Sequence, residues 1–228
     1  MMASKSIVRE DVWVRIPPAA PLLPSCRSEP RAPGWCVDPR NLEAPYVYLL
    51  GLYLGDGMLT KVPHKPVWKL RIFQDLRYPG LIAHAEEAMS VVSGRRVGFA
   101  QKIGCVDVYS HWKHWICLFP QHGPGPKHLR QIRLEGWQTN LIRQFPHDFI
   151  KGLIESDGCR ITNFTVVRGK RYEYPRYFFS NRSMDIQGLF RGACDLVGVE
   201  YRQDGSWQIS VARRASAALL DEFIGPKR

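Results

Sequence analysis

Two aspartates, Asp56 and Asp157, end two copies of one short sequence pattern and are the residues best suited to do chemistry. The first copy reads YVYLLGLYLGDG over residues 46–57, and the second reads FIKGLIESDG over residues 149–158. Each copy places apolar residues around a glycine, then a small residue, then Asp-Gly. Such an internal repeat predicts one structural unit that is used twice, with the aspartate in the same local position each time.

Small residues spaced four apart in each copy predict how the two units meet. Gly51 with Gly55, and Gly152 with Ser156, would lie on one face of a helix and let a second helix approach closely. We expect the glycine after each aspartate to end its helix in the left-handed conformation. The two carboxylates would then lie at neighbouring helix ends, where the last carbonyl oxygens already carry partial negative charge. A divalent cation would relieve this repulsion, since Mg²⁺ prefers oxygen ligands.

The two blocks, LLGLYLGDG at 49–57 and IKGLIESDG at 150–158, resemble the signature of the LAGLIDADG homing endonucleases. The resemblance implies an α+β fold with two pseudo-symmetric αββαββα halves in one chain, whose antiparallel β-ribbons form a saddle for double-stranded DNA. It also implies a monomer that cuts both DNA strands at a specific site across the minor groove. The implied cofactor is Mg²⁺, with Mn²⁺ or Ca²⁺ able to occupy the same place.

The resemblance places the metal at the two repeated blocks. Asp56 and Asp157 are the expected ligands, and the backbone carbonyls of Gly55 and Ser156 are expected to complete the shell. The alternative is that the aspartates only cap helices and bind a structural water. Leu54 departs from the signature, because many members have an acidic residue at that position, as the second copy does.

Further site residues follow from the resemblance. A basic residue after the last strand of each half is expected beside the metal, which assigns Lys113 and Arg213. Such a cation would stabilise the extra negative charge of the transition state; the alternative is an ordinary surface or phosphate-contacting base. Gln74 and Asn181 fall where a polar residue positions water.

The order of predicted elements divides the chain into four parts. These are a proline-rich arm over 1–44, a first half over 45–120, a linker and lead-in over 121–145, and a second half over 146–228. In the arm, residues 7–16 could pair as a strand. After the first motif we expect strands at 67–73, 95–102 and 105–109, and helices at 79–92 and 111–119. The second half repeats this order, with strands at 159–167, 174–180, 199–203 and 206–211, and helices at 183–197 and up to residue 223.

The net charge of +11 favours an anionic partner, most often nucleic acid. Two twisted β-ribbons would follow the major groove, where base edges can be told apart. We expect most basic side chains there to contact phosphate. The candidates are Lys61, Lys65, Lys69, Arg71, Arg95, Arg96 and Lys102 in the first half, and Arg160, Arg168, Lys170, Arg171, Arg176, Arg182 and Arg202 in the second.

A protein of this fold that only binds is the competing function: a catalytically silent transcriptional regulator on DNA, or an RNA-binding splicing helper. Asp56, Asp157, Lys113 and Arg213 together favour the enzyme, since a binder has no need of two crowded carboxylates. A zinc site is a further alternative, but the candidate ligands match no established zinc spacing. They are Cys105, His111, His114, Cys117, His122 and His128.

The cysteines and the apolar runs bear on the cellular compartment. The six cysteines form no C-x-x-C pair, which favours a reduced compartment. Four prolines interrupt the only early apolar stretch, so no signal peptide is expected. The longest apolar run, residues 46–55, is too short to span a bilayer. We therefore expect a cytoplasmic protein with access to DNA and no membrane contact.

Overall fold

A computed structural model describes residue 37 and residues 42–227; the predicted strand at 7–16 lies outside the described residues. The first half contains α1 (Ala44–Asp56), β1 (Gly57–Lys61), β2 (Trp68–Asp75), α2 (Pro79–Ser93), β3 (Val97–Lys102), β4 (Cys105–Trp112) and α3 (Trp115–Leu118). A connecting segment contains the 3₁₀ turn η4 (Lys127–Leu129) and α4 (Gly136–Gln144). The second half contains α5 (Pro146–Asp157), β5 (Gly158–Val167), β6 (Lys170–Ser180), α6 (Met184–Val197), β7 (Arg202–Gln203), β8 (Gln208–Val211) and α7 (Arg214–Phe223). The predicted α+β architecture with repeated αββαββα halves is confirmed.

The two sheets have the same topology and register. Their strand orders are β1-β2-β4-β3 and β5-β6-β8-β7, and every pairing is antiparallel. In each sheet the glycine after the motif aspartate faces Ile72 or Phe179 of the second strand, which in turn faces Val108 or Ile209. This shared register identifies which residues of the two halves are structurally equivalent.

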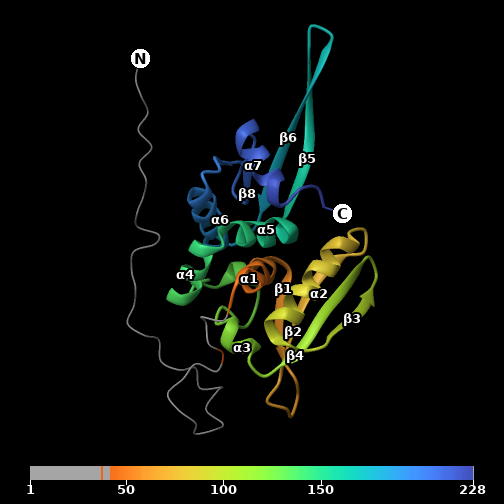
Figure 1. Cartoon of the computed structure of the whole chain (residues 1–228), viewed down its shortest axis with the longest axis vertical. Coiled ribbons are helices and arrows are strands. Elements are labelled where there is room, and N and C mark those ends of the chain that lie inside the picture. The colour runs from red at the N-terminus through yellow and green to blue at the C-terminus, as the bar shows by residue number, and fades with distance from the viewer. Residues whose placement is uncertain (1–36, 38–41, 228) are drawn as a thin grey trace.

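The two motif helices, α1 and α5, form the interface between the halves. Figure 1 shows them side by side in the middle of the molecule, with one sheet on either side. A Cβ atom on Gly51 would lie 2.7 Å from the carbonyl oxygen of Phe149 and 2.9 Å from the Cα of Gly152. No side chain fits there, so the close helix crossing predicted from the small residues is confirmed.

The glycines that end the motif helices do not adopt the predicted left-handed conformation. Gly57 has φ −87° and Gly158 has φ −112°, both extended, because each is already the first residue of a strand. Crowding explains these glycines instead. A Cβ on Gly57 would lie 2.8 Å from the Cδ2 of Tyr53, and one on Gly158 would lie 2.8 Å from the Cα of Ile154.

The predicted helix at 111–119 is wrong over its first half. Strand β4 continues to Trp112, which pairs with Trp68 of β2, so that only the four residues of α3 remain helical. Trp115 is fully buried, and its indole donates a hydrogen bond to the carbonyl oxygen of Ser110. The aromatic side chains of this segment fill the core.

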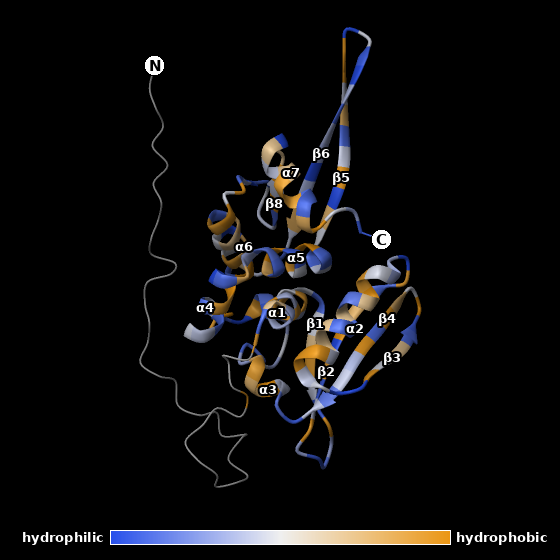
Figure 2. Ribbon diagram, in the orientation of Figure 1, coloured by the Kyte–Doolittle hydropathy of each residue, from blue (hydrophilic) through white to orange (hydrophobic). Residues whose placement is uncertain are grey.

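The β5–β6 hairpin extends well beyond the rest of its sheet (Figure 1). Strand β8 pairs only with residues 177–180 of β6, so the outer part of the hairpin is a two-stranded ribbon. Hydrophilic and hydrophobic bands alternate along it (Figure 2), and Phe164 and Val166 are exposed. Within residues 42–227, no helix is long and apolar enough to cross a membrane.

Candidate active site

Asp56 and Asp157 lie at the carboxyl ends of α1 and α5, at one interface. A Cβ on Gly55 would lie 3.0 Å from Oδ2 of Asp157, so the second aspartate reaches across to the first helix. Burial and then the charge of Asp157 raise the pKa of Asp56 to about 6, although the charges of Lys227 and Lys127 oppose the shift. Burial also raises the pKa of Asp157. Two carboxylates that disfavour ionisation are thus held together.

Asn181 and Gln74 occupy equivalent positions, each two residues after the matched Ile72 and Phe179. The side-chain amide of Asn181 donates a 2.5 Å hydrogen bond to Oδ2 of Asp157, which opposes the rise in the pKa of that aspartate. Gln74 is 3% exposed, and its Nε2 has no hydrogen-bond partner among the described residues. In the second half the amide of Asn181 therefore binds the carboxylate, whereas in the first half the Nε2 of Gln74 has no partner among the described residues.

Lys127 is a cation at the site that the sequence patterns did not predict. It belongs to η4 in the connecting segment, and its Nζ donates to the carbonyl oxygens of Tyr53, Gly55 and Gly57 at 2.5, 2.9 and 2.7 Å. Burial lowers its pKa to about 8, although both aspartates oppose that shift. The lysine thus neutralises the negative end of α1 directly beside the carboxylates.

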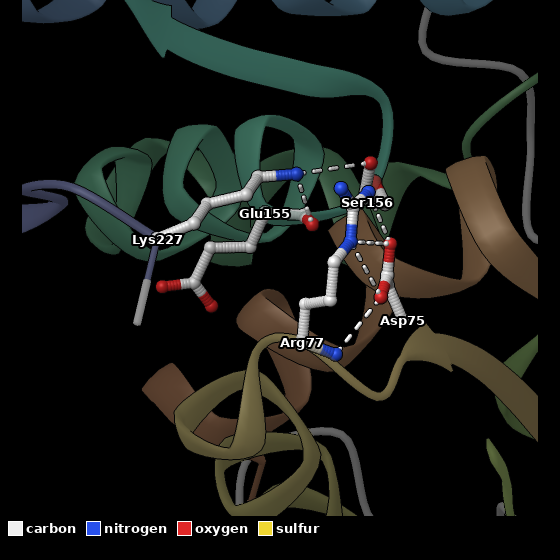
Figure 3. Close-up of polar contacts among 5 residues, drawn as sticks. All are labelled: Asp75, Arg77, Glu155, Ser156 and Lys227. Carbon is white, nitrogen blue, oxygen red and sulfur yellow. Dashed lines mark hydrogen bonds and ion pairs between the residues drawn. The ribbon is translucent and has the colours of Figure 1, made fainter. Parts of the chain in front are cut away.

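Lys227 does the same for α5 and was also missed. Figure 3 shows its side chain reaching the backbone oxygens of Glu155 and Ser156, to which Nζ donates at 2.8 and 3.3 Å. Burial lowers its pKa, and Asp56 is the first of the acids that oppose this shift. Asp75 of the first half, bound to Arg77, lies beside the same end of α5.

Spacing is the signal that could have identified these lysines. Lys127 follows Asp56 by 71 residues (127 − 56), and Lys227 follows Asp157 by 70 (227 − 157). Each lies just past the last helix of its half, α3 or α7. The repeat therefore extends beyond the last helix, where neither segment has a periodic pattern.

Lys113 and Arg213 do not occupy the predicted place beside the aspartates. Lys113 is exposed on the turn after β4, where its charge acts on His114. Arg213 is also exposed and forms an ion pair with Glu200. In the first half, the short α3 explains why Lys113 is not beside the aspartates. Residue 113 lies on a surface turn and not within a helix that packs on the motif.

The side chains of Leu54 and of its acidic counterpart Glu155 are both buried. Leu54 is a core residue at 1% exposure, and Glu155 is buried at 3%. The Glu155 carboxylate accepts a hydrogen bond from Tyr48 of the opposite motif helix. The departure from the signature at Leu54 therefore changes the contact between the halves and leaves the two aspartates in place.

Comparison with solved structures decides the fold. The structure of I-DmoI in complex with DNA and Mn matches with a TM-score of 0.52 at 17% identity, covering 81% of this chain and 98% of that one. The LAGLIDADG meganuclease I-AabMI bound to uncleaved DNA matches with a TM-score of 0.50 at 11% identity, covering 78% and 82%. The chain has the LAGLIDADG homing-endonuclease fold. No family model matches the sequence, and no curated protein matches it.

The LAGLIDADG site offers two carboxylates to a metal ion but fewer free carbonyls than predicted. The carbonyl oxygens of Gly55 and Ser156 already accept from Lys127 and Lys227. In the described part of the chain, no group of three or more His, Cys, Asp or Glu side chains could hold a metal ion, so the predicted zinc alternative finds no support. Two carboxylates still suit Mg²⁺, which commonly binds one or two of them together with substrate phosphates.

A cavity of about 760 Å³ opens beside this site. The connecting segment forms one wall, from His122 to Arg130, and residues 180–182 form another. Asp157 and Lys127 both line it. Charged groups of the LAGLIDADG interface are therefore accessible to a ligand from this side.

The predicted DNA contacts divide by strand face. On β2 and β3, Lys69, Arg71 and Lys102 alternate with the core residues and point away from the core. Arg160 does not: its guanidinium binds Asp221 of α7 at 2.6 and 2.9 Å, and it lies opposite the buried Tyr177. The prediction that Arg160 contacts DNA is therefore wrong, because this side chain binds the hairpin to α7 on the core side of the sheet. The remaining candidates are exposed or part-buried on strands and loops: Lys61, Lys65, Arg95, Arg96, Arg168, Lys170, Arg171, Arg176, Arg182 and Arg202.

Proposed function

We propose that this protein is a site-specific endonuclease that cuts both strands of double-stranded DNA and depends on Mg²⁺. The observation that carries the proposal is the pair of aspartates at one helix interface, each with a part-buried lysine bound to its own helix end. Ionised carboxylates repel one another there, and burial penalises both of them. A protein that only bound DNA would gain nothing from that arrangement.

The proposed metal ligands are the carboxylates of Asp56 and Asp157. A bound divalent cation would lower the pKa of a water molecule and stabilise charge on the scissile phosphate. Asn181 holds one of these carboxylates by a hydrogen bond, which fixes its orientation toward the interface. Gln74 is proposed to hydrogen-bond a water through its unpaired amide.

Lys127 and Lys227 are proposed to act by charge. Three carbonyl oxygens surround the Nζ of Lys127, and only the ammonium form has three hydrogens to donate. This geometry therefore favours the charged form although burial opposes it. A fixed ammonium beside the carboxylates would stabilise the additional negative charge of a phosphodiester transition state.

Two further observations support DNA as the substrate. The chain carries a net charge of +11, and basic side chains point outward from the β-strands of both halves. The similar structures named above were solved with DNA, one of them also with Mn. We propose the same partner for this chain, with the two sheets lying along one duplex and the monomer contacting both half-sites.

The decisive experiment begins with selection of a binding site from a randomised duplex library in Ca²⁺. The selected site is then placed in a supercoiled plasmid and incubated with Mg²⁺. We expect linear product and an affinity that falls steeply with salt, because neutralised phosphates release counterions. Tight binding without cutting at any Mg²⁺ concentration would instead favour a transcriptional regulator. Affinity that does not change with salt would point to a partner other than nucleic acid.

A further inference from the structure

The outer face of the first sheet contains a buried acid. Asp107 of β4 is 1% exposed, and it lies opposite Phe73 of β2. It is on the face away from the core, because it alternates with the core residues Val106 and Val108. A buried carboxylate is costly, and on a surface that faces a polyanion it also repels the ligand.

Asp107 binds one basic residue of the same face. The Nε of Arg71 donates to Oδ2 at 2.8 Å, and its Nη2 lies 2.5 Å from the same oxygen. The other carboxylate oxygen, Oδ1, has no hydrogen-bond partner within residues 42–227. The carboxylate is thus committed to the side edge of the guanidinium.

The pairing leaves a defined edge of Arg71 free. With Nε and one hydrogen of Nη2 engaged, the end of the guanidinium still carries hydrogens on Nη1 and Nη2. The ring of Phe73 supports the flat group at 5.0 Å, and the side chain is only 19% exposed. Arg71 therefore presents a rigid two-pronged donor, the geometry that matches O6 and N7 of guanine in the major groove.

The second half shows that the fold does not require this pair. By the shared register, Arg71 corresponds to Phe178 and Asp107 corresponds to Gln208. Neither of those residues is charged, yet the second sheet has the same strand order. The ion pair is therefore particular to the first half, where a difference in DNA readout would be located.

We propose that Arg71, oriented by Asp107, reads one guanine in the half-site covered by the first sheet, and that the second half-site has no matching contact. This inference rests on the proposed DNA-binding function. Arg71 is the specificity residue and Asp107 is its positioning residue. The Arg71–Asp107 pair discriminates the guanine, whereas neighbouring basic side chains such as Lys69 contact phosphates.

The test is a binding profile of the full chain on a randomised duplex library in Ca²⁺, so that cleavage does not interfere. The parent should show one strongly preferred guanine in one half-site, with other bases weaker by about 5- to 150-fold, the range of one bidentate contact. Arg71→Lys keeps the charge but not the fork, so that preference should vanish while binding to random DNA stays level. Asp107→Asn should relax the same position and leave random binding level or tighter.

Matched controls separate readout from folding. Gln208→Ala changes the equivalent position of the second half and should leave the guanine preference intact. Melting temperatures identify any variant that fails to fold. Arg71→Lys is the substitution least expected to disturb folding, because it keeps the positive charge. An Arg71→Lys protein with an unchanged profile overturns the inference, as does an Asp107→Asn protein that loses affinity equally for all sequences. A parent that binds no duplex at all would overturn the proposed function itself.

Discussion

The two halves build the same site from different local contacts. In the first half, Lys127 comes from the connecting segment and satisfies three carbonyl oxygens, while no side chain within residues 42–227 donates to Asp56. In the second half, Lys227 follows the last helix and contacts two carbonyl oxygens, while Asn181 holds Asp157. The pairing of carboxylate and cation is common to both, and the means of fixing each group differs.

The largest expected effect is on cleavage when either aspartate is neutralised. Asp56→Asn and Asp157→Asn each remove one carboxylate charge, so cutting of the selected plasmid should fall by about 10³-fold or more. DNA affinity should stay level or rise, because a repulsive charge is removed. Agarose gels of nicked and linear product, with binding measured in parallel, check both statements. Full cutting by either variant would mean that the aspartates only cap helices.

The two lysines should differ in rank. Lys127→Met loses three hydrogen bonds to carbonyls and should slow cleavage by about 10²-fold, whereas Lys227→Met loses two and should slow it less. Lys113→Met and Arg213→Met are the controls, because both side chains are exposed away from the aspartates. Single-turnover rates at saturating protein make the comparison. If the Lys113 variant were the slowest, the residue predicted from sequence would be the correct one.

The helix interface should tolerate no added atom in either half. Gly51→Ala and Gly152→Ala should each destabilise the fold by about 2–3 kcal/mol, because a Cβ would press on the backbone of the opposite helix. Gly188→Ala in α6 has open space around its Cβ and should stabilise by about 0.5–1 kcal/mol. Urea unfolding measures all three. An unchanged free energy of unfolding for Gly152→Ala would contradict the close crossing of α1 and α5.

The smallest expected effect is the pH dependence of stability in the absence of metal. The pKa of Asp56 is about 6 in the folded protein, above its ordinary value, so the ionised form destabilises the fold at high pH. That penalty, on the order of 1–2 kcal/mol after allowing for partial exposure, should be present above pH 6 and disappear as the pH falls toward 4. Asp56→Asn should therefore be more stable than the parent at pH 7.5 and similar to it at pH 4.5. Unfolding in EDTA at both values tests this, with Asp157→Asn expected to gain less because it also perturbs the bond from Asn181.

Local sequence patterns predicted the parts of this molecule that local physics determines. The repeated blocks predicted α1, α5 and their close crossing. Residues four apart in the sequence share one face of a helix, so the pattern of small residues is enough to show where two helices can approach. The equivalence of Gln74 and Asn181 also followed, since both lie close after the motif along a regular strand pair.

The parts that were missed depend on contacts between distant residues. Lys127 joins the site from 71 residues beyond Asp56, through a turn-rich segment without periodicity. Arg160 was assigned to DNA because a basic residue on a strand does not reveal which face it occupies, and only Asp221 of α7 decides that. The extension of β4 to Trp112 likewise depends on its pairing with Trp68 and not on the aromatic pattern itself.

Each lysine binds the end of the motif helix in its own half, which suits an origin of the chain by duplication of one unit. Within residues 42–227, the hydrogen bonds of Lys127 go to α1 and the start of β1, and those of Lys227 go to α5. A single ancestral unit would therefore have carried its carboxylate and its lysine together, with the lysine in the tail after its last helix. Tandem duplication of that gene would turn the tail of the first copy into the connecting segment and leave each lysine at the end of its own motif helix. The connecting segment would then be the former tail of the first copy, which Lys127 still holds against the end of α1.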